Sequence, residues 1–238
     1  MQFAFDRVFN SERHKTESLY SSCLKRSVQS MFRGESACVL LFGTSLSGKT
    51  YTLKGTKSEK GLVVRAVEEL FNIIQARSDA SAAAHEGRTS SAERSSFIVR
   101  ASAFQIHYHR FVDLLNATGT PHASSSKRIR LEHFLDDSRE DVVSKLKNVT
   151  ERVVPSLEDF HAVLKEVFKS RKYEANRKDR KSHMAITLSL EKRCASSKFE
   201  QLSLITFCEL AGSEQAVSQA EGHYRAIQRA HESSVERP

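Results

Sequence analysis

Tryptophan is absent from this 238-residue chain, and proline and cysteine are rare, with three and four residues. No stretch approaches the roughly 18 consecutive apolar residues of a membrane-spanning helix, and Met1 leads into charged sequence rather than the apolar core of a secretion signal. The four cysteines include no close pair with the spacing of zinc ligands. These absences predict a cytoplasmic protein with reduced, buried thiols that is neither exported nor inserted in a membrane.

The composition is otherwise that of a globular protein with an excess of basic residues. Hydrophobic residues make up 39% of the chain, and 37 Lys and Arg against 29 Asp and Glu give a formal net charge of +8. This charge favours an acidic partner: nucleic acid, a nucleotide, an anionic membrane or an acidic protein filament. Nucleic acid is not expected, because no helix-turn-helix, zinc or stacking-aromatic signature accompanies the charge. Basic residues cluster at 127–130 and 171–181, and a solvated surface is the simplest interpretation, with a phosphate-facing or filament-facing role as the alternative.

Segments with the period of a strand alternate with segments with the period of a helix. Continuous apolar runs or a two-residue alternation predict strands, and apolar residues three or four apart predict helices with one buried stripe. The chain is long enough for a hydrophobic core, and mixed segments without a repeat predict one α/β domain over residues 1–238. Strands are predicted at 37–42, from 97 toward 115, at 183–190 and at 202–208, and helices at 62–75 and 156–168.

Two polar stretches are predicted to be flexible surface loops within this domain. Ser and Ala dominate residues 78–96, and residues 116–126 are also polar, so neither stretch offers large apolar side chains for burial. A helix start is predicted further along, where Ser156 can cap and Asp159 follows three residues later.

Residues 43–50 read GTSLSGKT and match the phosphate-binding pattern G-x-x-x-x-G-K-[ST] at every defined position. The motif directly follows the predicted strand at 37–42, where such a loop belongs. Gly43 and Gly48 allow backbone N–H groups to face phosphate oxygens, and Lys49 adds a positive charge to the outer phosphates. Thr50 offers a hydroxyl to Mg²⁺. The motif therefore predicts nucleotide binding.

The helix after this loop is expected to be broken. Gly55 interrupts it after one turn, and helical periodicity resumes only beyond Gly61. In most proteins with this loop the helix continues for several turns. The interruption therefore limits which group of phosphate-binding-loop proteins this chain can belong to.

Six blocks of sequence, in order along nearly the whole chain, resemble the kinesin motor domain family. The loop with Tyr51 and Thr52 is similar to the family's G-Q-T-x-S-G-K-T-x-T, and two later blocks are similar to its two switch motifs. The resemblance implies a P-loop NTPase fold, a three-layer α/β/α arrangement with a central mixed sheet. It also implies ATP and Mg²⁺ as cofactors, microtubules as the partner and the cytoskeleton as the location. The blocks are 3–9, 43–52, 61–66, 105–115, 176–183 and 209–214.

By the same resemblance, the two switches read the γ-phosphate and single residues acquire roles. Lys49 is implied to be catalytic, as are Lys181 and Glu214, which keep the charges of the family's salt bridge between switches. Thr50 and Glu209 are implied to hold Mg²⁺. The implied nucleotide contacts are Gly43, Thr44, Ser45, Leu46, Ser47, Gly48, Lys49, Thr50, Tyr51, Asn176, Ser182 and Gly212.

Several positions depart from the family pattern. Arg180 stands where the family has a serine that helps to hold the metal, and Glu209 replaces the aspartate that orients the metal's water shell. A cation beside Mg²⁺ is repulsive, and an added methylene misplaces a carboxylate whose geometry matters. Leu46 is expected to crowd the loop backbone, and Lys181 lacks the bidentate geometry of arginine. ATP hydrolysis is therefore expected to be slow or lost.

Two functions of different kinds follow. The first is a kinesin-like, ATP-binding motor domain that associates weakly with microtubules and supports microtubule-based movement, with impaired hydrolysis. The second is an inactive P-loop remnant that acts as an interaction module or is a truncated gene product. The domain is expected to be incomplete at both ends, because nothing before Phe3 supplies the family's first strand and its last strand and final helices do not follow Gly222.

Overall fold

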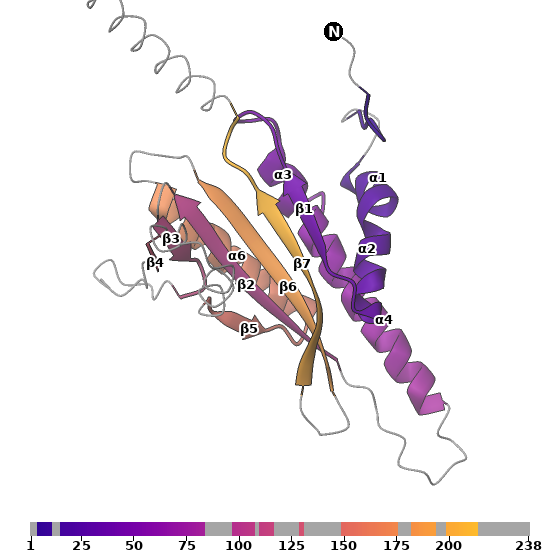
Figure 1. Ribbon diagram of the computed structural model, residues 1–238. Helices are drawn as coiled ribbons and strands as arrows, with labels where there is room; N and C mark the ends of the chain where they lie inside the picture. Colours follow the sequence, from indigo (N-terminus) through magenta and orange to yellow (C-terminus); the bar gives the residue numbers. More distant parts are fainter. Residues whose placement is uncertain are drawn as a thin grey trace, which may run out of the picture.

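The computed structural model describes residues 4–10, 15–83, 97–107, 110–116, 129–130, 149–175, 182–193 and 199–213 (Figure 1). Helical and strand segments are interleaved, as the sequence periodicity predicts, and the helical elements between Thr16 and Arg33 are an addition that was not predicted. The helical elements are α1 (Thr16–Leu19), the π-helical turn η1 (Tyr20–Leu24), α2 (Lys25–Ser30), the 3₁₀ turn η2 (Met31–Arg33), α3 (Lys49–Lys54), α4 (Leu62–Ala83) and α6 (Leu157–Ala175). The strands are β1 (Ala37–Leu41), β2 (Phe97–His107), β3 (Arg110–Asp113), β4 (Ile129–Arg130), β5 (Glu151–Val153), β6 (His183–Arg193) and β7 (Phe199–Glu209).

The strands form one mixed sheet in the order β1-β7-β6-β2-β3-β4, with β5 paired to β2. The pair β1 and β7 is parallel, with Leu41 opposite Glu209, and the other pairs are antiparallel. This confirms the predicted α/β class with a central mixed sheet. Because parallel neighbours end at the same edge, the segments that follow Leu41 and Glu209 lie side by side.

The core lies between one face of the sheet and the helices. Alternate residues of the three longest strands are buried on this face, including Ala101, Leu188 and Phe207, each at most 1% exposed. Figure 1 shows α6 crossing the far side of the strands, and α6 contributes buried Phe160 and Val167 to the same cluster. Burying one such large apolar side chain contributes on the order of 1.5–3 kcal/mol. The described helices cover this one face and supply, with the sheet, two of the three implied layers.

The predicted helix break is confirmed, and its cause is steric. Helix α3 ends at Lys54, and α4 begins at Leu62. Gly55 has φ +79°, and a Cβ at this position would lie 2.2 Å from the carbonyl oxygen of Glu59. Only glycine fits this close approach of two backbone segments, so the chain must leave the helix here.

The predicted start of the helix at Ser156 is also confirmed. The Ser156 hydroxyl accepts a hydrogen bond from the Asp159 N–H at 3.1 Å and donates one to the Asp159 carboxylate at 2.6 Å. This cap satisfies one of the unpaired N–H groups at the start of α6.

Two predictions need correction. Helix α4 continues through Ala83, so the first part of the predicted loop at 78–96 is helical, because its alanines favour a helix. Residues 84–96 and 117–126 lie outside the described residues. The prediction of buried thiols is wrong for Cys23 and Cys38, which are exposed, and Cys208 is only partly buried, while Cys194 lies outside the described residues. The single domain over residues 1–238 stays a prediction.

Candidate functional site

The loop of residues 43–50 connects the end of β1 to the start of α3, and its backbone depends on two glycines. Gly43 and Gly48 have φ values of +148° and +90°, which side-chain-bearing residues rarely adopt. A Cβ on Gly43 would lie 2.7 Å from the Ser47 hydroxyl oxygen. The Ser213 N–H donates to the Gly43 carbonyl at 3.2 Å, which ties the loop to the segment after β7. The loop therefore has the conformation that its glycines predict.

Lys49 places its charge over this loop. Its Nζ donates hydrogen bonds to the carbonyl oxygens of Gly43 at 2.9 Å and of Thr44 at 2.5 Å. The ammonium group is thus held at the mouth of the loop by two neutral acceptors. An anion in the loop would compete well for it, because a hydrogen bond between two charged groups is roughly twice as strong as a neutral one.

Leu46 does not crowd the loop as predicted. It adopts φ +63°, and its side chain is fully exposed at the outside of the loop. The strain of a left-handed leucine is on the order of 1–2 kcal/mol, but the side chain points away from the backbone that phosphate would contact. The expected steric conflict is therefore wrong, because the backbone turns the side chain outward.

The metal side of the loop contains an ion pair. Glu209, at the end of β7, accepts two hydrogen bonds from the Arg171 guanidinium: Nη1 to Oε2 at 2.8 Å and Nη2 to Oε1 at 3.0 Å. The Thr50 hydroxyl donates to the same Oε1 at 2.7 Å. The Glu209 side chain is 6% exposed and that of Arg171 is 18% exposed. The buried Glu209 carboxylate, the partly buried Arg171 guanidinium and the hydroxyl of exposed Thr50 thus form one hydrogen-bonded network beside the loop.

Helix α6 packs against α4 and β2, and its C-terminal part brings Arg171 into this network. One turn before Arg171, the Phe168 ring of α6 lies under the Lys54 ammonium of α3, 4.5 Å from its centroid. Thr50 lies one turn before Lys54 on α3. The C-terminal half of α6 therefore contacts α3 at Lys54, and Arg171 reaches the Glu209 carboxylate to which Thr50 of α3 donates.

Sequence reasoning missed the role of Arg171, which it assigned to a solvated basic surface. The signal was present in the helical spacing. Arg171 follows buried Val167 and Phe168 by four and three residues, so it continues the buried stripe of α6. A charged residue on a buried stripe needs a partner, and Glu209 provides it.

These contacts test the predicted magnesium site, and the site does not fit. Mg²⁺ requires oxygen ligands in near-octahedral geometry. Both Glu209 oxygens accept from the guanidinium, and Oε1 also accepts from the Thr50 hydroxyl, so the carboxylate is the predicted ligand that is already engaged. A cation already compensates the carboxylate at the place where the ion would lie. Among the described residues, no group of three or more His, Cys, Asp or Glu side chains offers an alternative metal site.

The two switch motifs meet in the structure at their described ends. His183 Nδ1 accepts a hydrogen bond from the Ala211 N–H at 3.2 Å. Ser182, which directly precedes His183 in the sequence, is buried, and Gly212 directly follows Ala211. The remaining predicted switch residues, Asn176, Arg180, Lys181 and Glu214, lie outside the described residues, so their roles stay predictions.

Tyr51, the residue predicted to contact adenine, is accessible to a ligand beside the loop. It lies on α3, two residues after Lys49, and is 48% exposed. An exposed aromatic ring next to the loop is available for stacking, and the role stays a prediction.

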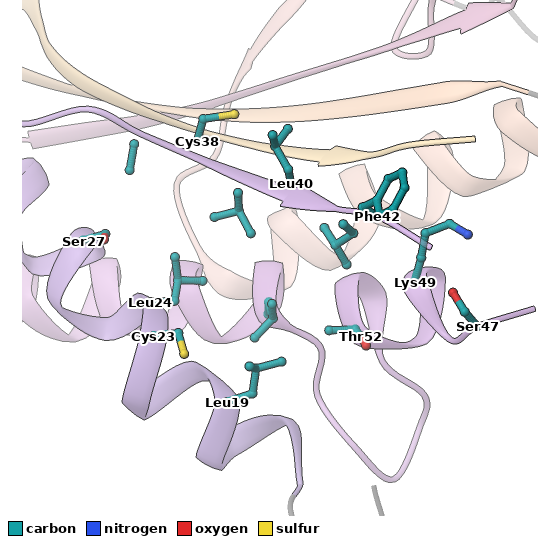
Figure 2. A pocket seen from close by; sticks show the side chains of 14 residues that line it. Leu19, Cys23, Leu24, Ser27, Cys38, Leu40, Phe42, Ser47, Lys49 and Thr52 are labelled. Carbon is teal, nitrogen blue, oxygen red and sulfur yellow. The ribbon is translucent and has the colours of Figure 1, made fainter. Parts of the chain in front are cut away.

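A cavity of about 450 Å³ extends from the loop along β1 (Figure 2). At one end it is lined by Ser47 and Lys49, and at the other by apolar and thiol side chains from the helices, such as Leu24 and Cys23. In Figure 2 the Cys38 and Leu40 side chains of β1 point away from these helices, on the other side of the strand. The cavity therefore follows the edge of the sheet rather than the phosphate-facing side of the loop.

Comparison with known proteins gives the context of this site. The family profile described as the kinesin motor domain matches residues 1–234. The chain is 29% identical over 229 residues to the kinesin-like protein KIP2 of Eremothecium gossypii, an alignment that covers 92% of this chain and 30% of the relative. It is 26% identical over 219 residues to the human kinesin-1 heavy chain, covering 89% of this chain and 20% of the relative. The chain thus spans less than a third of the length of these relatives.

Two solved structures share the fold. One is a fast kinesin whose structure was interpreted for ATPase mechanism and interactions with microtubules, with a TM-score of 0.65, 22% identity, and coverage of 89% of this chain and 54% of that one. The other is the Drosophila kinesin family member NOD in complex with AMPPNP, with a TM-score of 0.65, 21% identity, and coverage of 89% and 59%. At these identities the likeness establishes the fold.

Proposed function

The chain belongs to the kinesin motor domain family, and from this premise we propose that it binds ATP at residues 43–50 as a kinesin-like, microtubule-associated domain. The observation that carries the proposal is the loop itself, with two glycines at positive φ and the Lys49 ammonium held at its mouth. A solved relative, NOD, is in complex with AMPPNP. The location that we propose is the cytoplasm, on the cytoskeleton. Among the described residues, the helices are too short or too polar to cross a membrane.

In this proposal different residues of the chain bind different parts of the nucleotide. The loop backbone and Lys49 hold the phosphates, because N–H groups and an ammonium converge on one concave turn. Tyr51 stacks on the base. Further contacts come from the switches: Asn176, Ser182 and Gly212, with Lys181 and Glu214 as the pair that couples the two switches.

We propose further that ATP turnover is slow. Glu209 is held by two hydrogen bonds to Arg171 and is not free to orient a water near the phosphates. Arg180 adds a second cation to the same region of the sequence. A misplacement of about 1 Å at a reacting centre can cost on the order of a hundredfold in rate. The Arg171–Glu209 pair thus also supports the second candidate function, in which the chain is a nucleotide-binding interaction module without efficient hydrolysis.

Nucleotide binding is tested with a fluorescent ATP analogue on the full chain. Lys49→Ala should weaken binding at least about tenfold, which corresponds to roughly 1.4 kcal/mol, because it removes a charge-assisted contact to phosphate. Lys57→Ala is the matched control, since Lys57 is an exposed lysine on the turn after α3. Equal affinity of the Lys49→Ala and Lys57→Ala proteins would contradict the proposal.

Turnover is tested by restoring the family residues. We expect the unmodified chain to release phosphate from ATP at least about a hundredfold more slowly than a human kinesin-1 motor domain under the same conditions, with or without microtubules. The combined change Arg180→Ser with Glu209→Asp should raise the rate. Fast, microtubule-stimulated turnover by the unmodified chain would show that slow hydrolysis is wrong, while nucleotide binding would stand.

A further inference from the structure

The Arg171 guanidinium pairs with the Glu209 carboxylate, to which the Thr50 hydroxyl also donates, and Thr50 and Glu209 are the two side chains predicted to hold Mg²⁺. We infer that Arg171 replaces the metal in this chain, so that nucleotide binds to the loop without Mg²⁺. The inference rests on the proposed function, since it concerns how the phosphates are held at the same loop. It is carried by one hydrogen-bonded network: the Arg171 guanidinium and the Thr50 hydroxyl both donate to the Glu209 carboxylate, and Thr50 is the last residue of the loop motif.

Charge balance is the first argument. Glu209 is 4% exposed, so its negative charge requires a compensating cation in the folded protein. Arg171 provides one positive charge through two hydrogen bonds, and the network is neutral as a whole. A divalent ion bound to the same carboxylate would be repelled by the guanidinium, and the carboxylate charge is already neutralised. The network therefore needs no metal ion for charge balance.

Ligand availability is the second argument. Oε1 of Glu209 accepts from both Thr50 and Arg171, and Oε2 accepts from Arg171. Mg²⁺ loses its water reluctantly and needs near-ideal geometry, so it competes poorly for oxygens that are already engaged. Sharing the carboxylate would break hydrogen bonds between charged groups in a buried site, where they are strongest.

The third argument is that a guanidinium can do what the metal would do for phosphate. The two hydrogen bonds to Glu209 use two of the five N–H donors that arginine carries. Its side chain is 18% exposed, against 6% for Glu209, so the open part of the network is the cationic part. Arginine's planar donors match phosphate oxygens. Arg171 is thus placed to neutralise a bound phosphate from the side of Thr50.

The primary experiment needs no variant. The full chain is titrated with the fluorescent ATP analogue in buffer with excess Mg²⁺ and in buffer with excess EDTA. We expect the two dissociation constants to agree within about twofold. Binding that is at least about tenfold weaker in EDTA would overturn the inference and leave the proposed function intact. Absence of binding in both buffers, by a chain whose circular dichroism shows it folded, would overturn the proposed function and this inference with it.

Two variants test the role of Arg171 itself. Arg171→Gln leaves the Glu209 charge uncompensated, so the carboxylate should repel phosphate in EDTA and recruit Mg²⁺ when it is present. We expect this variant to bind at least about tenfold more tightly in Mg²⁺ than in EDTA. Arg171→Lys keeps the charge and should remain within about threefold between the two buffers. Arg33→Gln, a change at an exposed arginine, is the control and should behave like the unmodified chain.

If Arg171→Gln fails to fold, Glu209→Gln tests the same inference from the other partner. This change releases Arg171 from its carboxylate, so the free guanidinium should tighten nucleotide binding in EDTA severalfold. Unchanged or weaker binding by a folded Glu209→Gln protein, together with Mg²⁺-dependent binding by the unmodified chain, would show that Arg171 does not act on phosphate.

Discussion

Arg171 and Glu209 are separated by 38 residues and form a bidentate ion pair, with N–O distances of 2.8 and 3.0 Å. The pair joins α6 to the last residue of β7, and the Thr50 hydroxyl extends it to α3. One contact therefore connects the helix layer, the central sheet and the phosphate-binding loop. Its charge state affects both the stability of the domain and the chemistry available beside the loop.

The stability of the folded chain should depend on this pair. Arg171→Ala leaves the Glu209 carboxylate, 6% exposed, without its cation, and we expect the free energy of unfolding to fall by about 3 kcal/mol or more. Urea denaturation followed by circular dichroism measures the change. Arg33→Ala is the control, because both side chains of the Arg33–Glu35 pair are 58% exposed and solvent screens their attraction, so this change should lower stability far less than Arg171→Ala does. Similar losses in the two variants would contradict the prediction, as would a double variant, Arg171→Ala with Glu209→Ala, whose loss equals the sum of the single ones.

Microtubule binding by the chain should be weak and governed by charge. A net charge of +8 attracts an acidic filament, and this attraction is screened as the Debye length shortens from about 30 Å at about 0.01 M salt to about 8 Å at about 0.15 M. We expect the fraction that pellets with microtubules to fall severalfold between these conditions. Lys49→Ala should pellet like the unmodified chain, because it changes the nucleotide loop and only one charge of many. Pelleting that is insensitive to salt would point to an apolar interface instead.

The edge of the sheet at β1 should promote self-association. In the described part of the chain, β1 pairs with β7 alone, and Leu40 and Phe42 are 64% and 73% exposed. An exposed edge strand with apolar side chains can pair with a second copy. Leu40→Lys should therefore lower the oligomeric fraction seen by sedimentation velocity. Phe5→Lys, which removes an equally exposed aromatic ring outside the sheet, should leave that fraction unchanged.

The cysteine thiols should differ in reactivity. Burial, and to a smaller extent the neighbouring Cys38, together raise the pKa of the Cys208 thiol to about 11. A raised pKa disfavours the thiolate, so only about one Cys208 in a thousand is ionised at pH 8. Iodoacetamide at pH 8 should modify exposed Cys23 at least about tenfold faster than Cys208, as measured by peptide mass spectrometry. The Cys208 rate should rise with pH toward 11, and unfolding in urea should equalise the two sites. Equal rates in the folded chain would show that burial does not protect Cys208.

Features that depend on a few neighbouring residues could be predicted from the sequence. The loop at 43–50, the break at Gly55 and the cap at Ser156 were all predicted at their observed places. Each is determined by local geometry: a glycine that permits positive φ, a backbone approach that excludes a side chain, or a hydroxyl within reach of a free N–H. The helices at 62–75 and 156–168 and the long strands followed from hydrophobic periods of 3.6 and two residues, whereas the helical elements between Thr16 and Arg33 were not predicted.

The tertiary structure decided which distant side chains share the site. The simplest interpretation placed Arg171 on a solvated surface, with a phosphate-facing or filament-facing role as the alternative, yet the packing of α6 against α4 and β2 directs it to Glu209. Leu46 was predicted to crowd the loop, yet the loop's backbone turns it to solvent. The reason is physical: local propensity fixes a residue's conformation and the period of its face, whereas its partners depend on how helices and strands far apart in sequence pack together. The sequence therefore determined that a phosphate-binding loop is present, and only the fold decided that an arginine stands where the metal was expected.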